Sequence, residues 1–348
     1  MNFNREIDIA GKRISDDSET YIIAEAGVNH NGDIETAKKL IDTAAEAGVD
    51  AVKFQSFKSE KLVLGSTSKA PYQKQTTDSD ESQLDMLKAL EIDKSKMRML
   101  QDYAKSRNIT FLSTPFEKDS LDELCDLNIP AIKISATDIT NIQFLREAAK
   151  TQKPIILSAG MCYLEEVYKA LETIYRYNDK VVLLQCSANY PIQDEEANLN
   201  IIDTFKKEFD VLVGYSDHST GIGASPYAVA KGAKVIEKHF TLDKSMAGPD
   251  QAASVTPEEL KQLVREIRKV EKYLGSRLKM PTCSELGTRK SLQKCLVAKT
   301  DIKSGEIFME SNIVAKRTGG EGISAFYVDS VLMKHAKRDF QADDIIEL

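Results

Sequence analysis

Two histidines stand out among the residues that could do chemistry, because the chain has only four. His218 follows the short apolar run Val211–Gly214, and His239 follows the run Val235–Ile236. Runs of this kind are typical of buried parallel strands, so each histidine is expected just beyond a strand end. Carboxylates lie alongside the pair, at Asp217, Glu237 and Asp250. A lone histidine is more often structural, but the pair with its carboxylates predicts a site for a divalent metal such as Mn2+.

Two lysines lie inside apolar, strand-like segments. Lys53 stands between Val52 and Phe54, and Lys133 stands in the run Ala131–Ile134. An isolated ammonium group is costly to bury, so each lysine needs an anionic partner. A phosphate or carboxylate on a ligand would serve. The rival chemistry is that of a Schiff-base aldolase, in which a desolvated lysine attacks a carbonyl carbon.

Further polar side chains stand where other strand-like runs end. They are Glu25, Gln55, Thr114, Asp138, Ser158 and Tyr190. In a barrel of parallel strands, catalytic groups come from the carboxyl ends of the strands. The polar residues are therefore expected to form one ring around a single site.

The elements that would hold this ring alternate regularly from Tyr21 onward. Amphipathic helical stretches separate most of the strand-like runs, for example Ile34–Ala47, Lys94–Ser106 and Pro257–Leu274. The strand-like runs are Tyr21–Ala24, Ala51–Phe54, Thr110–Leu112, Ala131–Ile134, Ile155–Leu157, Val181–Leu184, Val211–Gly214 and Val235–Ile236. This alternation predicts a (β/α)8 TIM barrel. A doubly wound open sheet is the main rival, but no G-x-G-x-x-G follows the first run.

Composition divides the chain around this barrel. Residues 1–20 are a polar lead-in, expected to form a hairpin, and residues 21–275 form the barrel. Residues 276–290 are a polar linker, and residues 291–348 form a small second domain. In that domain CLVAKTDIKSGEIF predicts two short strands around a Lys-Ser-Gly turn. A glycine-rich loop with Arg317 follows, and so small a domain is expected to dock on another surface.

A long polar segment, Ser56–Gln83, interrupts the alternation after the second strand-like run. Long loops in compact domains are usually functional lids or disordered segments. Its place on the predicted active face favours a lid.

Composition also excludes several classes of protein. The net charge of −7 and the absence of a long basic run give no reason to expect a nucleic-acid partner. The five cysteines lack metal-ligand spacing, which fits a reducing compartment. No long apolar run or leader-like segment predicts a membrane partner. We therefore expect a cytoplasmic protein.

Several segments together resemble the sialic acid synthase family, the phosphoenolpyruvate-dependent nonulosonate synthases. They cover nearly the whole chain in order: IAEAGVNHNGD (23–33), VKFQSFK (52–58), APYQ (70–73), ESQLDMLKALE (81–91), FLSTPF (111–116), ILSAGM (156–161), GYSDHS (214–219) and IEKHFTLDKSMAGPD (236–250). The C-terminal LVAKTDIKSGEIF, with AKR and GISA, resembles the antifreeze-like (SAF) domain of the same enzymes. The chain departs from the family's usual residues at Ala136, Thr137, Asp138, Ala159, Ala188 and Thr318.

The resemblance implies a reaction and a set of roles. The family joins phosphoenolpyruvate to an open-chain N-acylated hexosamine with Mn2+, Mg2+ or Co2+ and releases phosphate. Carried over, His218 and His239 would ligate the metal, and Glu25 would position or deprotonate a reacting oxygen. The phosphoenolpyruvate contacts would be Lys53, Lys133, Gln55, Thr114 and Ser158, with Asp138 at a position where the family often has glutamate. The sugar contacts would be Glu237, Asp250 and Tyr190.

The resemblance further implies a domain-swapped homodimer, in which Arg317 of one subunit reaches the partner's barrel. The expected sugar is 2,4-diacetamido-2,4,6-trideoxymannose, giving N,N'-diacetyllegionaminate, or N-acetylmannosamine, giving N-acetylneuraminate. VKFQSFK with APYQ leans toward the first. Two alternatives stay open: a lysine Schiff-base aldolase, and a catalytically inactive sugar-binding barrel.

Overall fold

The computed structural model describes residues 1–69, 77 and 81–348. The chain forms two compact units, Met1–Gly275 and Ser276–Leu348. Residues 70–76 and 78–80 of the predicted lid lie outside the described part of the chain. They include the segment 70–73 with Tyr72. The described beginning of that segment forms a short helix, α2 (Ser59–Leu62).

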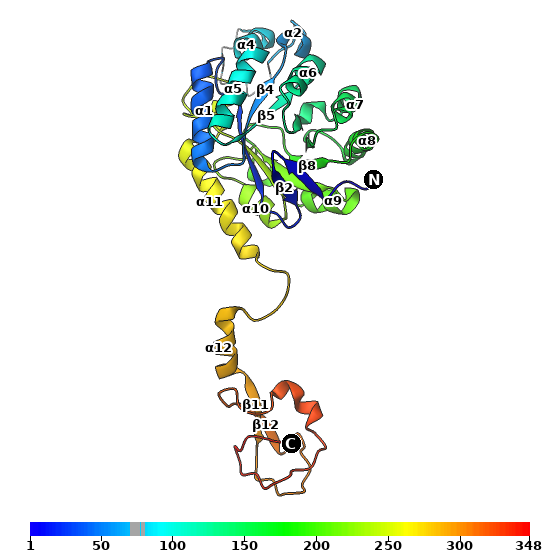
Figure 1. The fold of residues 1–348 in the computed structure, drawn as a ribbon, viewed down its shortest axis with the longest axis vertical. Helices are drawn as coiled ribbons and strands as arrows, with labels where there is room; N and C mark the ends of the chain where they lie inside the picture. The colour runs from blue at the N-terminus through cyan, green and yellow to red at the C-terminus, as the bar shows by residue number, and fades with distance from the viewer. Residues whose placement is uncertain (70–76, 78–80) are drawn as a thin grey trace. The chain divides into compact units, whose positions relative to one another are not determined.

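Eight parallel strands make the first unit a barrel (Figure 1). They are β3 (Tyr21–Gly27), β4 (Ala51–Ser56), β5 (Thr110–Pro115), β6 (Ile132–Ile134), β7 (Ile155–Ala159), β8 (Val181–Cys186), β9 (Leu212–Asp217) and β10 (Val235–His239). Hydrogen bonds join them in the order β5-β4-β3-β10-β9-β8-β7-β6, and β5 and β6 lie against each other at the ends of this order. The predicted (β/α)8 barrel is confirmed, and the open-sheet alternative is wrong.

Helices surround the strands and bury one face each. They are α1 (Ile34–Ala47), α4 (Gln83–Leu90), α5 (Lys94–Ser106), α6 (Lys118–Asp126), α7 (Ile142–Lys150), α8 (Leu164–Tyr175), α9 (Ile201–Phe209), α10 (Ser225–Ala230) and α11 (Pro257–Leu274), with 3-10 turns η1 (Ala136–Asp138), η2 (Asp194–Ala197) and η3 (Gln251–Ala253). Helix α1 shows why they form. Asp33 caps its first turn by accepting from the Thr36 N–H at 2.8 Å, and Leu40, Ile41 and Ala44 are buried at helical spacing.

A β-hairpin precedes the barrel, formed by β1 (Glu6–Ile9) and β2 (Lys12–Ser15). The Asn4 N–H donates to the Asp179 carbonyl at 2.9 Å, and Lys12 pairs with Asp50. Asp50 directly precedes β4, and Asp179 lies two residues before β8. The hairpin therefore covers the end of the barrel where the strands begin and leaves the opposite end to the site.

The second unit has a separate small core around an antiparallel pair, β11 (Lys294–Ala298) and β12 (Ile313–Arg317). It also contains α12 (Cys283–Leu292) and η4 (Ala325–Ser330). The predicted pairing of two strands around the turn at Gly305 is wrong. The turn is present, but Ile307 after it bridges to His335, because β11 pairs instead with the more distant β12.

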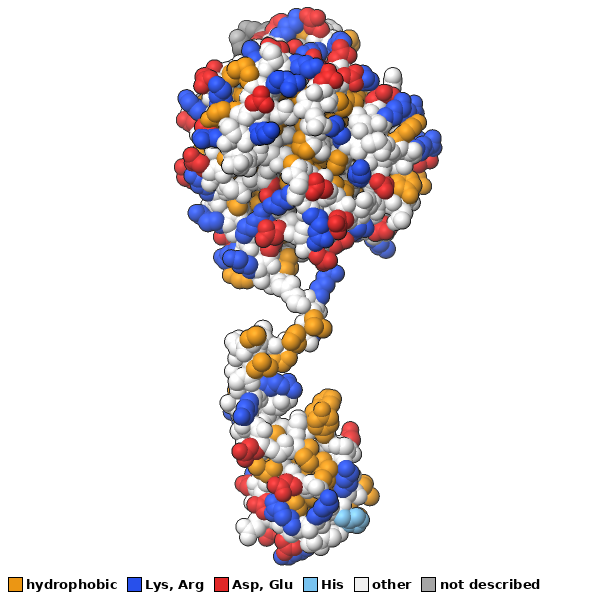
Figure 2. Space-filling model, viewed as in Figure 1, with side chains coloured by type: hydrophobic (Ala, Val, Ile, Leu, Met, Phe, Trp, Pro, Cys, Tyr) orange, Lys and Arg blue, Asp and Glu red, His pale blue; other side chains and the backbone are white. Residues whose placement is uncertain are grey.

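Acidic and basic side chains are interspersed over the face of the barrel seen in Figure 2. All five cysteines are free thiols. Within residues 1–69, 77 and 81–348, no helix combines the length and apolar character that a membrane span requires.

Candidate active site

A cavity of about 420 Å³ lies at the end of the barrel where the strands finish. Of the residues predicted to form the site, all line this cavity except Asp138, Asp217 and Arg317. The lining members are Glu25, Lys53, Gln55, Thr114, Lys133, Ser158, Tyr190, His218, Glu237, His239 and Asp250. The expected ring of polar groups is thus brought together in one place.

Strand alternation and one bulge aim these side chains inward. Along β4, Lys53 and Gln55 face the cavity because successive side chains point to opposite faces of a strand. Between Glu25 and Gly27 the register of β3 against β4 shifts by a residue. Gly27 has a φ of 54°, and a Cβ there would lie 3.4 Å from both the Gln55 Nε2 and the Glu25 Oε1. Glycine therefore lets the chain turn close to the site.

A network of two lysines and two glutamates forms the floor of the cavity. The Lys53 Nζ lies 2.7 Å from the Glu25 Oε2 and donates to the Thr114 Oγ1 at 2.8 Å. It also lies 3.6 Å from the Glu237 Oε2, while the Lys133 Nζ lies 3.2 Å from the Glu237 Oε1. All four charged side chains are buried, so the charge of each must be compensated by a neighbour of opposite charge.

The pKa values of the four groups in this network are shifted in different directions. Burial alone would raise the pKa of Glu237, but Lys133 and Lys53 override it and lower that pKa to about 2. Burial raises the pKa of Glu25 to about 7, against the opposing effect of Lys53. Burial would lower the pKa of Lys53, but Glu237 and Glu25 raise it, whereas burial does lower the pKa of Lys133. With Glu25 readily protonated, the floor favours an added anion.

His218 is held as a neutral ring with one nitrogen turned to the cavity. Its Nδ1 lies 2.7 Å from the Ser187 carbonyl oxygen, which can only accept, so Nδ1 carries the proton. Burial lowers the pKa of His218 to about 4. The Nε2 therefore presents a lone pair, which is what a metal ligand requires.

His239 lies beside His218, with ring centroids 5.5 Å apart. Burial, and then the neighbouring His218, lower its pKa well below the ordinary histidine range. Its Nδ1 is buried without a hydrogen-bond partner among the described residues, and the Asp250 Oδ2 is 3.9 Å away. An orphaned ring nitrogen beside a second imidazole fits a divalent ion.

The protein ligands for such an ion are few. In the described part of the chain, no group of three or more histidine, cysteine, aspartate or glutamate side chains is arranged to hold a metal. The two imidazoles would therefore leave most coordination positions to substrate and water, as in catalytic sites that keep open positions. Tyr190 lies against both rings, with centroid distances of 4.1 Å to His218 and 5.3 Å to His239. Burial raises the pKa of Asp250 to about 6.

Asp217 does not join this group, although it directly precedes His218. It is buried on the other face of β9, where its Oδ1 lies 3.2 Å from the Lys238 Nζ. Ser219 and Ser225 each donate a backbone N–H and a hydroxyl to its carboxylate. The expectation that Asp217 belongs to the metal site is therefore wrong, because strand alternation turns it away.

Two further predicted residues, Asp138 and Arg317, lie outside the cavity lining. Asp138 accepts from the Asn141 Nδ2 at 3.1 Å and from the Thr137 Oγ1 at 3.3 Å, and so holds η1, whose Ala136 and Thr137 do line the cavity. Arg317 ends β12 in the second unit, where its side chain is exposed.

Two features of the lining were not among the predicted site residues. Ser216 donates to the Glu237 Oε1 at 3.0 Å. Its position two residues before His218 placed it on the same strand face, and that signal was available. The other feature is an apolar cluster, here called the apolar wall: Val28, Phe57, Leu62, Met86, Leu87, Leu90 and Phe116, all of which line the cavity. Its helical members look like ordinary core residues in the sequence.

The chain is similar to known proteins in sequence and in fold. Residues 40–279 match the NeuB family. The chain is 48% identical over 330 residues to the N,N'-diacetyllegionaminic acid synthase of Campylobacter jejuni, covering 94% of this chain and 98% of that protein. It is 42% identical to the synthase of the same name from Legionella pneumophila, covering 90% and 89%. A crystal structure of the N-acetylneuraminic acid synthetase of Leptospira borgpetersenii, in complex with citrate, is similar with a TM-score of 0.74 at 34% identity, covering 84% and 98%.

Proposed function

Because the chain belongs to the NeuB family, we propose that it is an enzyme that condenses phosphoenolpyruvate with an open-chain N-acylated hexosamine. The product is a nine-carbon 2-keto-3-deoxy acid, and phosphate is released. The relatives from Campylobacter jejuni and Legionella pneumophila favour 2,4-diacetamido-2,4,6-trideoxymannose as the sugar and N,N'-diacetyllegionaminate as the product. N-acetylmannosamine, giving N-acetylneuraminate, is the second candidate within the family.

The observation that carries this proposal is the convergence of two buried lysines and two neutral imidazoles on one cavity. Phosphoenolpyruvate is an anion with a phosphate and a carboxylate. Lys53 and Lys133 can pair with these groups, and Gln55, Thr114 and Ser158 can donate hydrogen bonds to them. The Ser158 hydroxyl supports this role, since it is buried with no hydrogen-bond partner among the described residues.

His218 and His239 would hold a divalent ion such as Mn2+, Mg2+ or Co2+, which when bound would hold and polarise the sugar aldehyde. The Ser187 carbonyl keeps the His218 lone pair aimed at the cavity. Tyr190 lies against both rings and limits their rotation.

The reaction forms a bond between C3 of phosphoenolpyruvate and the aldehyde carbon, and it consumes one water molecule. A proton must reach the former aldehyde oxygen, and another must leave the attacking water. Glu25 suits one of these transfers because burial raises its pKa to about 7, close to neutrality. Glu237 stays ionised between the lysines, and Asp250 lies where a sugar hydroxyl could donate to it. Asp138 acts only through the turn that it holds.

We also propose that the enzyme works as a domain-swapped homodimer, with Arg317 of one subunit contacting the sugar in the barrel of the other. The small core of the second unit and its exposed Phe326 and Met333 support a docked role for this unit. A planar guanidinium group suits the acyl carbonyl of the sugar.

Phosphate release tests the proposed function directly. The enzyme with Mn2+ and phosphoenolpyruvate should release phosphate only when 2,4-diacetamido-2,4,6-trideoxymannose or N-acetylmannosamine is also present.

Lys53→Met should weaken phosphoenolpyruvate binding by about 100-fold or more, since a desolvated charge pair is lost. Trapping by borohydride with pyruvate should leave the mass of the protein unchanged. A trapped adduct on a lysine would support the aldolase instead, and no turnover with either sugar would support the inactive barrel.

A further inference from the structure

The apolar wall of the cavity has no role in the chemistry proposed above. Its seven side chains form a cluster separate from the barrel core. Every member of the cluster lines the cavity, so the wall is more than packing beneath a helix. Four of them, Val28, Phe57, Met86 and Leu90, are at most 7% exposed.

The wall lies beyond the polar floor along the direction of the strands. Val28, Phe57 and Phe116 each come directly after the last residue of β3, β4 or β5. The floor residues Glu25, Lys53 and Thr114 lie within the same strands. A ligand whose reacting end contacts the floor therefore has its other end beside the wall.

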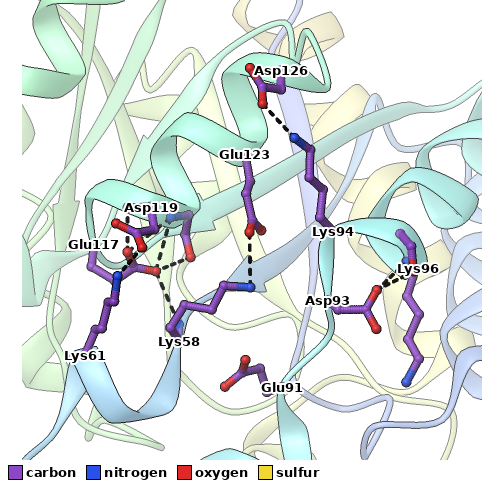
Figure 3. Close-up of polar contacts among 12 residues, drawn as sticks. Lys58, Lys61, Glu91, Asp93, Lys94, Lys96, Glu117, Asp119, Glu123 and Asp126 are labelled. Carbon is purple, nitrogen blue, oxygen red and sulfur yellow. Dashed lines mark hydrogen bonds and ion pairs between the residues drawn. The ribbon is translucent and has the colours of Figure 1, made fainter.

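Anchored elements hold the wall in place. The backbone N–H of Lys58 donates to the Glu117 carboxylate at 3.2 Å, and its Nζ lies 3.2 Å from the Glu123 Oε1 (Figure 3). Lys61 pairs with Asp119, as Figure 3 shows. These contacts fix the segment from Phe57 to Leu62 against α6.

The same segment is also tied to α4. The Ser59 N–H and hydroxyl donate to the Glu91 Oε2 at 2.9 Å and 2.8 Å. Glu91 is the C-cap residue of α4, whose Met86, Leu87 and Leu90 complete the wall. An apolar surface held from two sides is preorganised for a ligand group rather than formed by collapse.

We propose that the apolar wall is a specificity subsite for the deoxygenated C6 methyl end of the sugar. This inference rests on the proposed function. With phosphoenolpyruvate on the lysines of the floor, the aldehyde carbon must approach its C3 there. C6, at the other end of the open chain, therefore points away from the floor and meets the wall. A hydroxyl at C6 would lose its water against the seven apolar side chains of the wall, none of which offers a strong hydrogen-bond donor or acceptor, whereas a methyl group gains apolar contact. The subsite thus selects 6-deoxy sugars over sugars with a C6 hydroxyl.

Two sugars that differ only at C6 test the proposal: 2,4-diacetamido-2,4,6-trideoxymannose and its 6-hydroxyl analogue. The unaltered enzyme should favour the 6-deoxy sugar by roughly 10–100-fold in kcat/KM, the range in which apolar pockets discriminate. Leu87→Gln should reduce that preference by about 10-fold, because the amide offers the hydroxyl a partner.

Leu84→Gln is the matched control, since Leu84 is half-buried on the same helix but does not line the cavity. It should leave the preference unchanged. Leu62→Gln, on α2, gives a second test should Leu87→Gln not fold, and it should act like Leu87→Gln. Equal kcat/KM values for both sugars in the unaltered enzyme would overturn the subsite while leaving the proposed function intact. Equal effects of Leu84→Gln and Leu87→Gln would do the same. No activity with either C6 sugar or with N-acetylmannosamine would overturn the proposed function itself.

Discussion

The two buried lysines differ in how well the side chains of the cavity stabilise their positive charge. Lys53 is shared among Glu25, Glu237 and Thr114, and the two carboxylates raise its pKa. Lys133 has one carboxylate at 3.2 Å, and burial lowers its pKa. An incoming anion therefore gains more by pairing with Lys133, because it supplies the charge that this lysine lacks.

The two histidines allow a prediction about metal binding. His239→Ala should abolish specific Mn2+ binding and reduce kcat by at least about 100-fold, because one of two imidazole ligands is lost. Bound Mn2+ can be measured by electron paramagnetic resonance, with circular dichroism to show that the fold is intact.

His30→Asn is the control for loss of a buried histidine. His30 is buried but does not line the cavity, and its Nδ1 accepts from the Gly32 N–H at 2.9 Å, which an asparagine oxygen can also do. This variant should keep its Mn2+ stoichiometry. If His239→Ala kept its Mn2+ and its turnover, the ligand assignment would be wrong.

At the scale of the elements, the inner faces of β9 and β10 carry cavity residues and their outer faces carry a buried ion pair. Ser216, Glu237 and His239 face the cavity. Asp217 and Lys238, which are register partners, pair on the outer face. Lys238 also donates to the Ser219 carbonyl. The outer pair thus fixes the two strands that carry the histidines.

This pair predicts a stability effect that an exposed pair would not show. Lys238→Met should lower the free energy of unfolding by about 3–5 kcal/mol, because it leaves the Asp217 charge buried without a cation. Urea unfolding followed by circular dichroism measures the change. Lys231→Met is the control: Lys231 pairs with Asp203 at 2.7 Å on the surface, and its loss should cost less than about 1 kcal/mol. Similar losses in the two variants would contradict the role given to the outer pair.

Much of this arrangement could be predicted from the sequence. The predictions that failed did so for structural reasons. The strand/helix alternation predicted the barrel because each buried parallel strand is a short apolar run. Asp217 was misplaced because residues adjacent in sequence were grouped, although strand alternation puts them on opposite faces. The apolar wall could not be predicted, since Met86, Leu87 and Leu90 have the spacing of any core helix. The pairing of β11 with β12 depends on contacts between distant residues, which local patterns do not encode.

At the scale of the whole molecule, the proposed homodimer would combine the two compact units of different chains in one site. The barrel unit carries the cavity, and the unit Ser276–Leu348 carries Arg317, which is exposed at the end of β12. The glycines that follow, Gly319 and Gly320, have φ values of 74° and 89° and let the backbone turn sharply there. A tight turn of this kind can present Arg317 to a ligand in another subunit.

The swapped homodimer makes the most demanding prediction, because it requires two different chains to form one site. Arg317→Ala alone should raise KM for the sugar with little change in KM for phosphoenolpyruvate, and Lys53→Met alone should be inactive. Assayed at a sugar concentration far below the raised KM, the co-expressed variants should recover about a quarter of normal activity, since half of randomly formed dimers are mixed and each has one intact site. Co-expression of Lys53→Met with Lys133→Met is the control, and it should recover nothing, because both changes lie in the barrel. The contrary result is that isolated Arg317→Ala/Lys53→Met heterodimers show no more activity than the Arg317→Ala dimer. Arg317 would then contact the sugar in the barrel of its own subunit or not at all, and the swapped arrangement would be refuted.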